Sequence, residues 1–393
     1  MDDANFAVEE TPGEGLTRRE LVRRTAAVGV GVGLLGTISV EEAFGRTEKL
    51  DRVRWISPRG TLDVMDDYNI RVPMQMGYFK KLNIDVRLNA GAGSGEMQLV
   101  AANKIDMGYP SPGVLSSAVD AGIPVIGVWE QYPAQVFDFV LPGDSKIASP
   151  ADLAGKKIAV LTIGWKAIID PILADAGVDP GTVKYLELGP QWVQAVARGQ
   201  ADAGLAWEGL RAQLNGEAAH FGAGFSIKFL IGAKFSKDPS NVYAIRKSDL
   251  GDAKKKDIYT RFLAGVVQGF EFARANPRAA AQITYGQLPG LQSIISPQVA
   301  VESMVQLASG YSLRKRNGGQ WGSFDQNAWQ GYLATIAKLG QTKKQLSFGD
   351  IINTSLIAAA NKKADVVTAR RDAKAFKVDT YFKKTKLPAG LPL

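Results

Sequence analysis

The chain has no cysteine among its 393 residues and only one histidine. The absence of cysteine excludes disulfide bonds, thiolate chemistry and lipid attachment to an N-terminal cysteine, although it does not identify the compartment. The one histidine, His220, has no carboxylate or cysteine beside it, which disfavours a Ser/His/Asp triad or a histidine-rich metal site. After the N-terminal segment no run reaches 18 apolar residues, so we expect a soluble mature chain.

The N-terminal segment is similar to a twin-arginine export signal. Arg18 and Arg19 follow a polar beginning, and a weakly apolar stretch at 26–40 ends at two glutamates. That stretch holds 15 residues, too few to span a bilayer. We therefore expect residues 1–45 to be a Tat-type signal segment and the mature protein to be periplasmic and not a lipoprotein. The alternative is an amphipathic or disordered N-terminal arm.

Basic residues are in excess. The formal net charge is +8, and loss of residues 1–45, which hold eight acids and four arginines, raises it to +12. Half of this excess lies at 362–386, where nine bases accompany three acids. We interpret 360–393 as a solvated, poorly ordered basic tail rather than a surface for lipid or a partner. Aromatic and basic residues are not interleaved in the sequence, so this signal of a nucleic-acid partner is missing.

A nine-residue pattern occurs twice, 96 positions apart. Residues 100–108 read VAANKIDMG, and residues 196–204 read VARGQADAG. In each copy a residue that tolerates left-handed backbone, Asn103 or Gly199, is expected to end a helix before Asp-x-Gly opens a strand. Because ligands collect at strand ends in open α/β sheets, the pattern favours two lobes that face one cleft. The alternative is chance similarity between two alanine-rich helix ends.

Strand and helix patterns alternate along the first 250 residues. The expected strands are at 51–57, 84–88, 123–129, 137–141, 157–161, 182–188 and 242–245. Residues 215–224 have the composition of a loop, and from Asp252 onward the apolar period is helical. The short connections indicate an α/β fold with two doubly wound lobes and a helical C-terminal third.

Several motifs together resemble solute-binding proteins of ABC importers, in the sulfonate/nitrate/taurine and NMT1/THI5-like group. The motifs are GYFKKLNIDVR at 77–87, the glycine-rich turn at 90–96, DMGY at 106–109, DLAGKKI at 152–158 and GQADAG at 199–204. The resemblance implies a type II periplasmic binding protein, whose two lobes are joined by two chain crossings and close on a ligand. It places the crossings near 137–141 and 242–245. The lobes would be 50–141 with 243–350, and 142–242.

The resemblance also implies which loops contact the ligand. Their candidate residues are Ser57, Arg59, Thr61, Gly93, Ser94, Tyr109, Ser111, Trp165, Lys166, Trp207 and Glu208.

Each type of candidate residue has a chemical role and a simpler alternative. The aromatic rings would stack on a planar ligand, whereas Trp55 and Trp129 are equally suited to the core. Arg59 and Lys166 would balance a carboxylate or sulfonate, or are simply solvated. The glycine-rich turn offers N–H groups to an anion, or is a tight turn without a ligand. Glu208 would accept a hydrogen bond from the ligand or cap the following helix.

The expected function is the periplasmic substrate-binding component of an ABC importer. The solute would be small and organic, either aromatic, heteroaromatic or similar to a sulfonate or carboxylate. We expect a monomer without a cofactor, whose partners are a permease and its cytoplasmic ATPase.

Two other functions fit the same fold, namely an enzyme of pyrimidine or sulfur metabolism and a ligand sensor for a membrane receptor. Paired carboxylates suited to a hydrolase occur at Asp66-Asp67, but we interpret them as helix acids. The cysteine-rich motif of a pyrimidine-forming relative has no counterpart here, which disfavours that activity.

Overall fold

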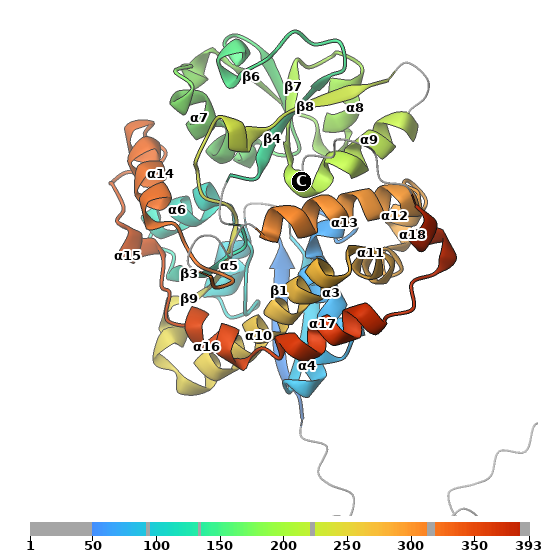
Figure 1. Cartoon of the computed structure of the whole chain (residues 1–393). Helices are drawn as coiled ribbons and strands as arrows, with labels where there is room; N and C mark the ends of the chain where they lie inside the picture. The colour runs from blue at the N-terminus through green and yellow to red at the C-terminus, as the bar shows by residue number, and fades with distance from the viewer. Residues whose placement is uncertain (1–48, 92–94, 133–134, 221–224, 313–318, 386–393) are drawn as a thin grey trace, which may run out of the picture. The chain divides into compact units, whose positions relative to one another are not determined.

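The computed structural model describes residues 49–385 except 92–94, 133–134, 221–224 and 313–318. The expected signal segment and the candidates Gly93 and Ser94 therefore lie outside the described residues. Figure 1 shows two sheets, each flanked by helices, within the unit formed by residues 49–393. Across these described ranges, no helix combines the length and the apolar character needed to cross a membrane.

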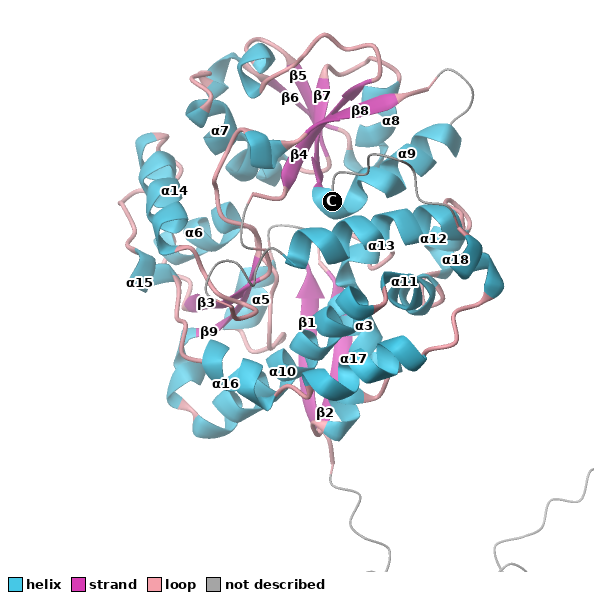
Figure 2. Ribbon diagram, in the orientation of Figure 1, coloured by secondary structure: helices cyan, strands magenta, loops and turns pink. Residues whose placement is uncertain are grey.

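One sheet has five strands in the order β6-β5-β7-β4-β8 (Figure 2). The strands β5 and β6 are parallel, as are β5 and β7, whereas β4 runs antiparallel to both β7 and β8. Their bounds are Phe137–Pro142 for β4, Lys157–Val160 for β5, Lys184–Glu187 for β6, Ala203–Trp207 for β7 and Ile227–Leu230 for β8.

The position of β4 differs from the expectation that this strand ends the first lobe. Its residues pair with Trp207 in β7 and with Leu230 in β8, so β4 belongs to the five-stranded sheet. The chain therefore passes from one sheet to the other between Glu130 and Phe137, ahead of the predicted crossing at 137–141.

The other sheet is made of two strand pairs joined by isolated bridges. The strands β1 (Asp51–Ser57) and β2 (Ile84–Ala90) are parallel, and β3 (Val125–Glu130) and β9 (Val242–Arg246) are antiparallel. Met107 bridges to β1 and Gly108 bridges to β9. The resulting order, β2-β1-(107–108)-β9-β3, repeats that of the five-stranded sheet, with Asp-x-Gly at the third position of each.

The two copies of the repeat have the same backbone. Asn103 has φ 58° and Gly199 has φ 68°, so both helices end in the left-handed residue that the pattern predicts. The N–H of Asn103 donates to the carbonyl of Val100, and that of Gly199 donates to the carbonyl of Val196. The helix ends predicted from the two nine-residue segments are confirmed.

Each aspartate of the repeat connects its strand to the neighbouring strand in the same way. The N–H of Asp106 donates to the carbonyl of Arg54 at 2.9 Å, and that of Asp202 donates to the carbonyl of Lys157 at 2.9 Å. In return, the Asp106 carboxylate accepts from the Arg54 N–H at 3.0 Å and the Asp202 carboxylate from the Lys157 N–H at 2.8 Å. The two similar segments thus form equivalent hydrogen bonds in both sheets.

Helices cover both sheets and form most of the chain after Asp252. Those with at least six residues are α3 (Tyr68–Gln75), α5 (Glu96–Ala101), α6 (Pro112–Asp120), α7 (Lys166–Asp175), α8 (Trp192–Ala197), α9 (Arg211–His220), α10 (Ala253–Ala275), α11 (Pro277–Tyr285), α13 (Pro297–Ser312), α14 (Gln326–Lys338), α16 (Ile357–Lys363) and α17 (Val366–Ala375). The shorter ones are α4 (Tyr78–Lys81), α12 (Pro289–Gln292), α15 (Phe348–Ile351) and α18 (Thr380–Lys384).

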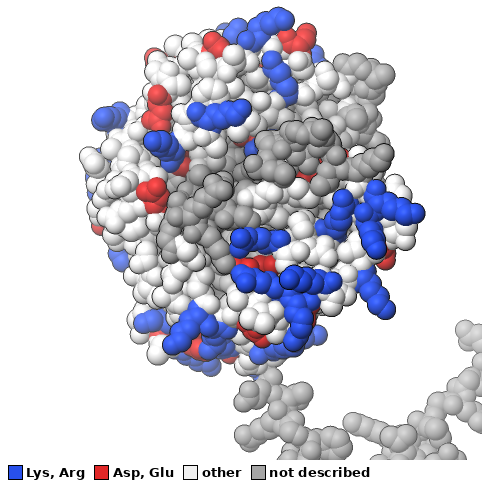
Figure 3. Space-filling model, viewed as in Figure 1, with Lys and Arg blue, Asp and Glu red and all other residues white. Residues whose placement is uncertain are grey.

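Two expected irregular segments are helical instead. Helix α9 extends through the expected loop as far as His220, because Leu210, Leu214 and Ala218 form a buried face at helical spacing. The basic tail, as far as it is described, forms α16, α17 and α18, where Ala369, Ala373 and Phe382 are buried. Its lysines and arginines lie on the outer side of these helices, over the part of the surface where Figure 3 shows clustered basic side chains.

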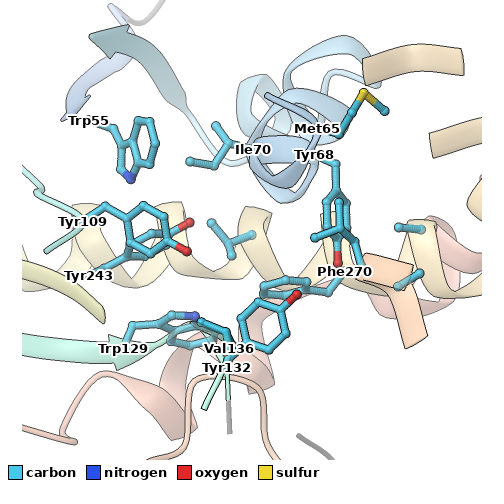
Figure 4. Packing of buried hydrophobic residues seen from close by; sticks show 14 of the residues in the cluster. Trp55, Met65, Tyr68, Ile70, Tyr109, Trp129, Tyr132, Val136, Tyr243 and Phe270 are labelled. Atoms are coloured by element: carbon cyan, nitrogen blue, oxygen red, sulfur yellow. The ribbon is translucent and has the colours of Figure 1, made fainter. Parts of the chain in front are cut away.

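The core of the first lobe is rich in aromatic side chains (Figure 4). Trp55 and Trp129 are fully buried, so both belong to the core rather than to a ligand sandwich. Tyr109 lies beside Trp55, with ring centroids 5.8 Å apart, and meets Tyr243 edge to face at 5.2 Å. This packing fixes the end of the strand segment 107–108, which Tyr109 and Ser111 follow.

The equivalent aspartates provide a matched test of this architecture. Asp106 is buried and also accepts from the Arg54 guanidinium at 2.8 Å, so Asp106→Ala removes charge-assisted hydrogen bonds and should lower the free energy of unfolding by about 2–3 kcal/mol. Asp202→Ala removes an exposed hydrogen bond and should cost about 1 kcal/mol. Urea unfolding of both variants measures the difference, and equal losses would contradict it.

Candidate functional site

A cavity of about 60 Å³ lies between the two sheets, and residues of both contribute to its wall. The first lobe contributes Pro58, Arg59, Asp66, Tyr109, Ser111 and Val114, and the second contributes Gly164, Trp165, Ile168, Leu205 and Trp207. The segments that connect the sheets add Tyr132, Val136, Phe137 and Asn241. Five of the eleven candidate residues therefore meet at one cavity.

The repeated architecture brings together the residues that follow the two Asp-x-Gly segments, Tyr109 and Ser111 after the first and Trp207 after the second. Tyr109 and Ser111 follow the strand segment 107–108, and Trp207 ends β7, which has the equivalent place in the other sheet. Ser111 also begins α6, where its hydroxyl accepts from the Val114 N–H at 3.3 Å. The ends of the two duplicated strands thus line the same cavity.

Arg59 is held by two carboxylates. Its Nη1 donates to Asp66 Oδ2 at 2.6 Å and its Nη2 donates to Asp67 Oδ1 at 2.5 Å. The Arg59 side chain is 9% exposed, and those of the two aspartates are 4% and 2% exposed. The guanidinium carbon lies 5.6 Å from the Tyr109 ring centroid and 5.7 Å from that of Trp207. The expected cation of the site is therefore neutralised by groups of the protein itself.

Asp66 also connects the two lobes. Trp207 Nε1 donates to Asp66 Oδ2 at 3.1 Å, so a residue of β7 binds a carboxylate of the first lobe. Burial raises the pKa of Asp66 to about 6, and the nearby charge of Asp67 adds to the rise, whereas Arg59 and the Trp207 N–H oppose it. A carboxyl group with this pKa changes its charge close to neutral pH.

The tryptophans of the second lobe form a connected cluster. The Trp165 ring meets Trp207 at 6.3 Å and Trp192 at 5.5 Å between centroids, both nearly perpendicular. Trp192 is buried, whereas Trp165 and Trp207 are partly exposed and line the cavity. The buried ring thus fixes the orientation of a ring that is available to a ligand.

Three other candidates, Ser57, Thr61 and Lys166, are described and are not among the residues that line the cavity. Ser57 is fully buried, and its hydroxyl accepts from the Arg59 N–H at 3.2 Å, which helps to position Arg59. Thr61 is exposed. Lys166 lies over the Tyr185 ring at 5.0 Å from its centroid. Nothing is described of the Glu208 side chain.

Sequence reasoning missed the role of Asp66 and Asp67. Both precede α3 in a short 3-10 helix, Met65–Asp67, and both are buried. An available signal was their position in the sequence, since two adjacent acids stand between Met65 and Tyr68 in an otherwise apolar stretch. Over the residues that the structure describes, histidine, cysteine, aspartate and glutamate nowhere form a group of three able to hold a metal ion.

The raised pKa of Asp66 predicts a pH dependence of stability. An unfolded aspartate titrates near 3.9, so between about pH 4 and pH 6 folding takes up a proton at Asp66 and stability falls as the pH rises. Asp66→Asn lacks this loss, so its stability relative to wild type should improve between pH 4 and pH 7. Urea unfolding at both values tests this, with Asp63→Asn as a control for net charge. An unchanged difference between variant and wild type would contradict it.

Comparison with solved structures places the fold among periplasmic binding proteins. The alkanesulfonate-binding protein SsuA from Xanthomonas axonopodis pv. citri, bound to MOPS, superimposes with a TM-score of 0.58 at 15% identity, over 78% of this chain and 98% of that one. The periplasmic aliphatic sulphonate-binding protein SsuA from Escherichia coli gives 0.53 at 14% identity, over 78% and 93%. At these identities the likeness concerns the fold.

Comparison of sequences identifies the family. A Haemophilus influenzae protein named for thiamine biosynthesis is 27% identical over 140 residues, which are 35% of this chain and 45% of that protein. The chain thus matches less than half the length of this relative. Residues 69–280 match the sequence profile of the family described as NMT1/THI5 like, and that match covers more than half of the chain. The chain therefore belongs to the NMT1/THI5-like family.

Proposed function

We propose that the protein binds a small organic solute between its two lobes and presents it to an ABC permease with a cytoplasmic ATPase. The observation that carries this proposal is the cavity between the sheets, lined by Tyr109 from one duplicated strand and Trp207 from the other. The fold of the family and the export-like N-terminal sequence agree with a periplasmic binding role. The protein would act as a monomer and without a cofactor.

The lobes would move about two chain passages. We place the first between Glu130 and Phe137 and the second before Val242, where β9 returns to the first sheet. The first lobe would then contain residues 50–130 and 242–350, and the second would contain residues 137–241. This division keeps every strand in the lobe with which it pairs.

The structure has the features of a closed form. Residues of both lobes line the cavity, so separation of the lobes would open it to a ligand. The two lobes also make direct contacts with each other. The Ser303 hydroxyl donates to the carbonyl of Gly209 at 2.8 Å, and Gly113 packs against Ala167. A bound ligand would shift the population toward this form.

The rings around the cavity favour a planar, aromatic solute. Trp165, Trp207 and Tyr109 offer large apolar faces, and each stacked pair contributes about 0.5–1.5 kcal/mol beyond the burial of surface. The sulfonates in the names of the solved structures refer to those proteins and not to this chain.

An enzyme on the same fold is the second candidate, because the curated relative is named for a biosynthetic role. A thermal-shift screen of the full chain against aromatic acids, sulfonates, pyrimidines and vitamins tests both functions. A binding protein returns its ligand unchanged after incubation, whereas conversion of a stabilising compound would favour the enzyme.

Loss of a cavity ring should weaken binding. Trp165→Ala removes a face of the cavity and should raise the Kd of the best compound of the screen more than tenfold, or about 1.4 kcal/mol. Isothermal titration measures this, and Tyr381→Ala, which removes an exposed aromatic ring far along the chain, is the control. An affinity equal to that of wild type would reject stacking by Trp165.

Closure should fail when the contact between α6 and α7 is crowded. A Cβ atom at Gly113 would lie 2.6 Å from the Ala167 carbonyl oxygen, so Gly113→Ala should oppose closure by about 1–3 kcal/mol and weaken binding accordingly. Gly349 is likewise the second residue of its helix, but it has open space around it, so Gly349→Ala is a matched control.

Small-angle scattering provides the second measurement for these glycine variants. With saturating ligand, the Gly113→Ala protein should retain a larger radius of gyration than wild type or Gly349→Ala. Equal affinity and equal compaction in all three proteins would contradict closure through this contact.

A further inference from the structure

The one guanidinium at the described part of the cavity wall is bound by two carboxylates, one at the wall and one behind it. Arg59 and Asp66 line the cavity, and Asp67 binds Arg59 from behind. Arg71, whose charge interacts with Asp67, donates to the carbonyl of Leu62 and does not line the cavity. Arg59 is the only lysine or arginine among the described lining residues. The wall therefore offers no cation beyond one that two carboxylates already neutralise.

The two carboxylates that bind Arg59 also weaken its attraction for an anion. A guanidinium recognises a carboxylate or sulfonate with two parallel N–H groups. Here Nη1 and Nη2 each give one N–H to a carboxylate, of Asp66 and of Asp67, so the charge of the guanidinium is already balanced within the protein. An incoming anion would approach this balanced pair and would face the carboxylate of Asp66, which repels it in a site of low dielectric constant.

Three buried polar atoms of the lining residues have no hydrogen-bond partner in the described part of the chain. They are the donor Arg59 Nε and the acceptors Asp66 Oδ1 and Asn241 Oδ1. Of these residues, Arg59 and Asp66 are more than nine-tenths buried. Buried groups of this kind are normally paired, and a group left unpaired is a candidate for pairing with a ligand. Asp66 Oδ2 is already occupied by Arg59 and Trp207, so Oδ1 is the atom left to accept from a solute.

We propose that Asp66 determines ligand specificity by accepting a hydrogen bond from an uncharged or cationic head group and by excluding anions. This inference rests on the proposed function and specifies its substrate class. The head group is planar, offers an N–H to Asp66 Oδ1 and has either an acceptor for Arg59 Nε or no group there. Aryl amides and amidines have this chemistry. Aryl carboxylates and sulfonates, which the isolated sequence positions of Arg59 and Lys166 favoured, lack the donor and have the wrong charge.

The test uses four probes that share one ring and differ in the head group. These are benzamidine, benzamide, benzoate and benzenesulfonate, each titrated into the full chain at pH 7.5 by isothermal calorimetry. We expect benzamidine and benzamide to bind at least tenfold more tightly than the two anions. Asp66→Asn keeps the size of the side chain but removes its charge, and should reduce this preference at least fivefold. Asp63→Asn, a partly exposed change of the same charge outside the cavity wall, should retain it.

The outcomes separate this inference from the proposed function. Tightest binding of benzoate or benzenesulfonate would overturn the role of Asp66 while leaving an aromatic solute site in place, as would equal binding of all four probes. An unchanged preference in a folded Asp66→Asn protein would overturn it as well. Binding of none of the four would count against the aromatic cavity, and so against the proposed function itself. The wild-type titrations decide between these results even if the variant fails to fold.

Discussion

The structure depends on a connection that is made twice, once in each sheet. Asp106 and Asp202 exchange main-chain and side-chain hydrogen bonds with the strand beside them, through Arg54 and Lys157. This exchange fixes the register of the central strand, and the register decides which residues stand at its end. Tyr109 and Trp207 consequently occupy equivalent places, and the two sheets present them to one cavity. The site is thus a consequence of pairing inside each lobe.

The local sequence pattern was sufficient to predict where the strands lie, but not which strands pair with each other. All seven expected strands exist, with ends within two residues of the prediction, and the left-handed residues at Asn103 and Gly199 have the expected backbone. The lobe of β4 could not be predicted, because its pairing with β7 and β8 joins segments about 65 to 90 residues apart. The C-terminal tail was misjudged through its charge, although the buried Ala369 and Ala373 give it an apolar face at helical spacing.

The candidate site shows a similar limit. Loop positions could be inferred from the resemblance to the family, and Arg59, Tyr109, Ser111, Trp165 and Trp207 do meet at the cavity. The sign of the charge there could not be inferred, since it depends on which acids fold back onto Arg59. Asp66 and Asp67 lie seven and eight residues further along the chain, at a distance at which a loop has many conformations.

In the proposed mechanism, closure and recognition share one carboxylate and would therefore be energetically coupled. Trp207 belongs to the second lobe and reaches Asp66 of the first only when the lobes are together, and this bond occupies Asp66 Oδ2. Closure also removes water from the carboxylate, which makes an unpaired Oδ1 costly. A solute that donates to Oδ1 offsets that cost only in the closed form. By differential binding, such a solute stabilises the closed form over the open one, whereas an anion does not.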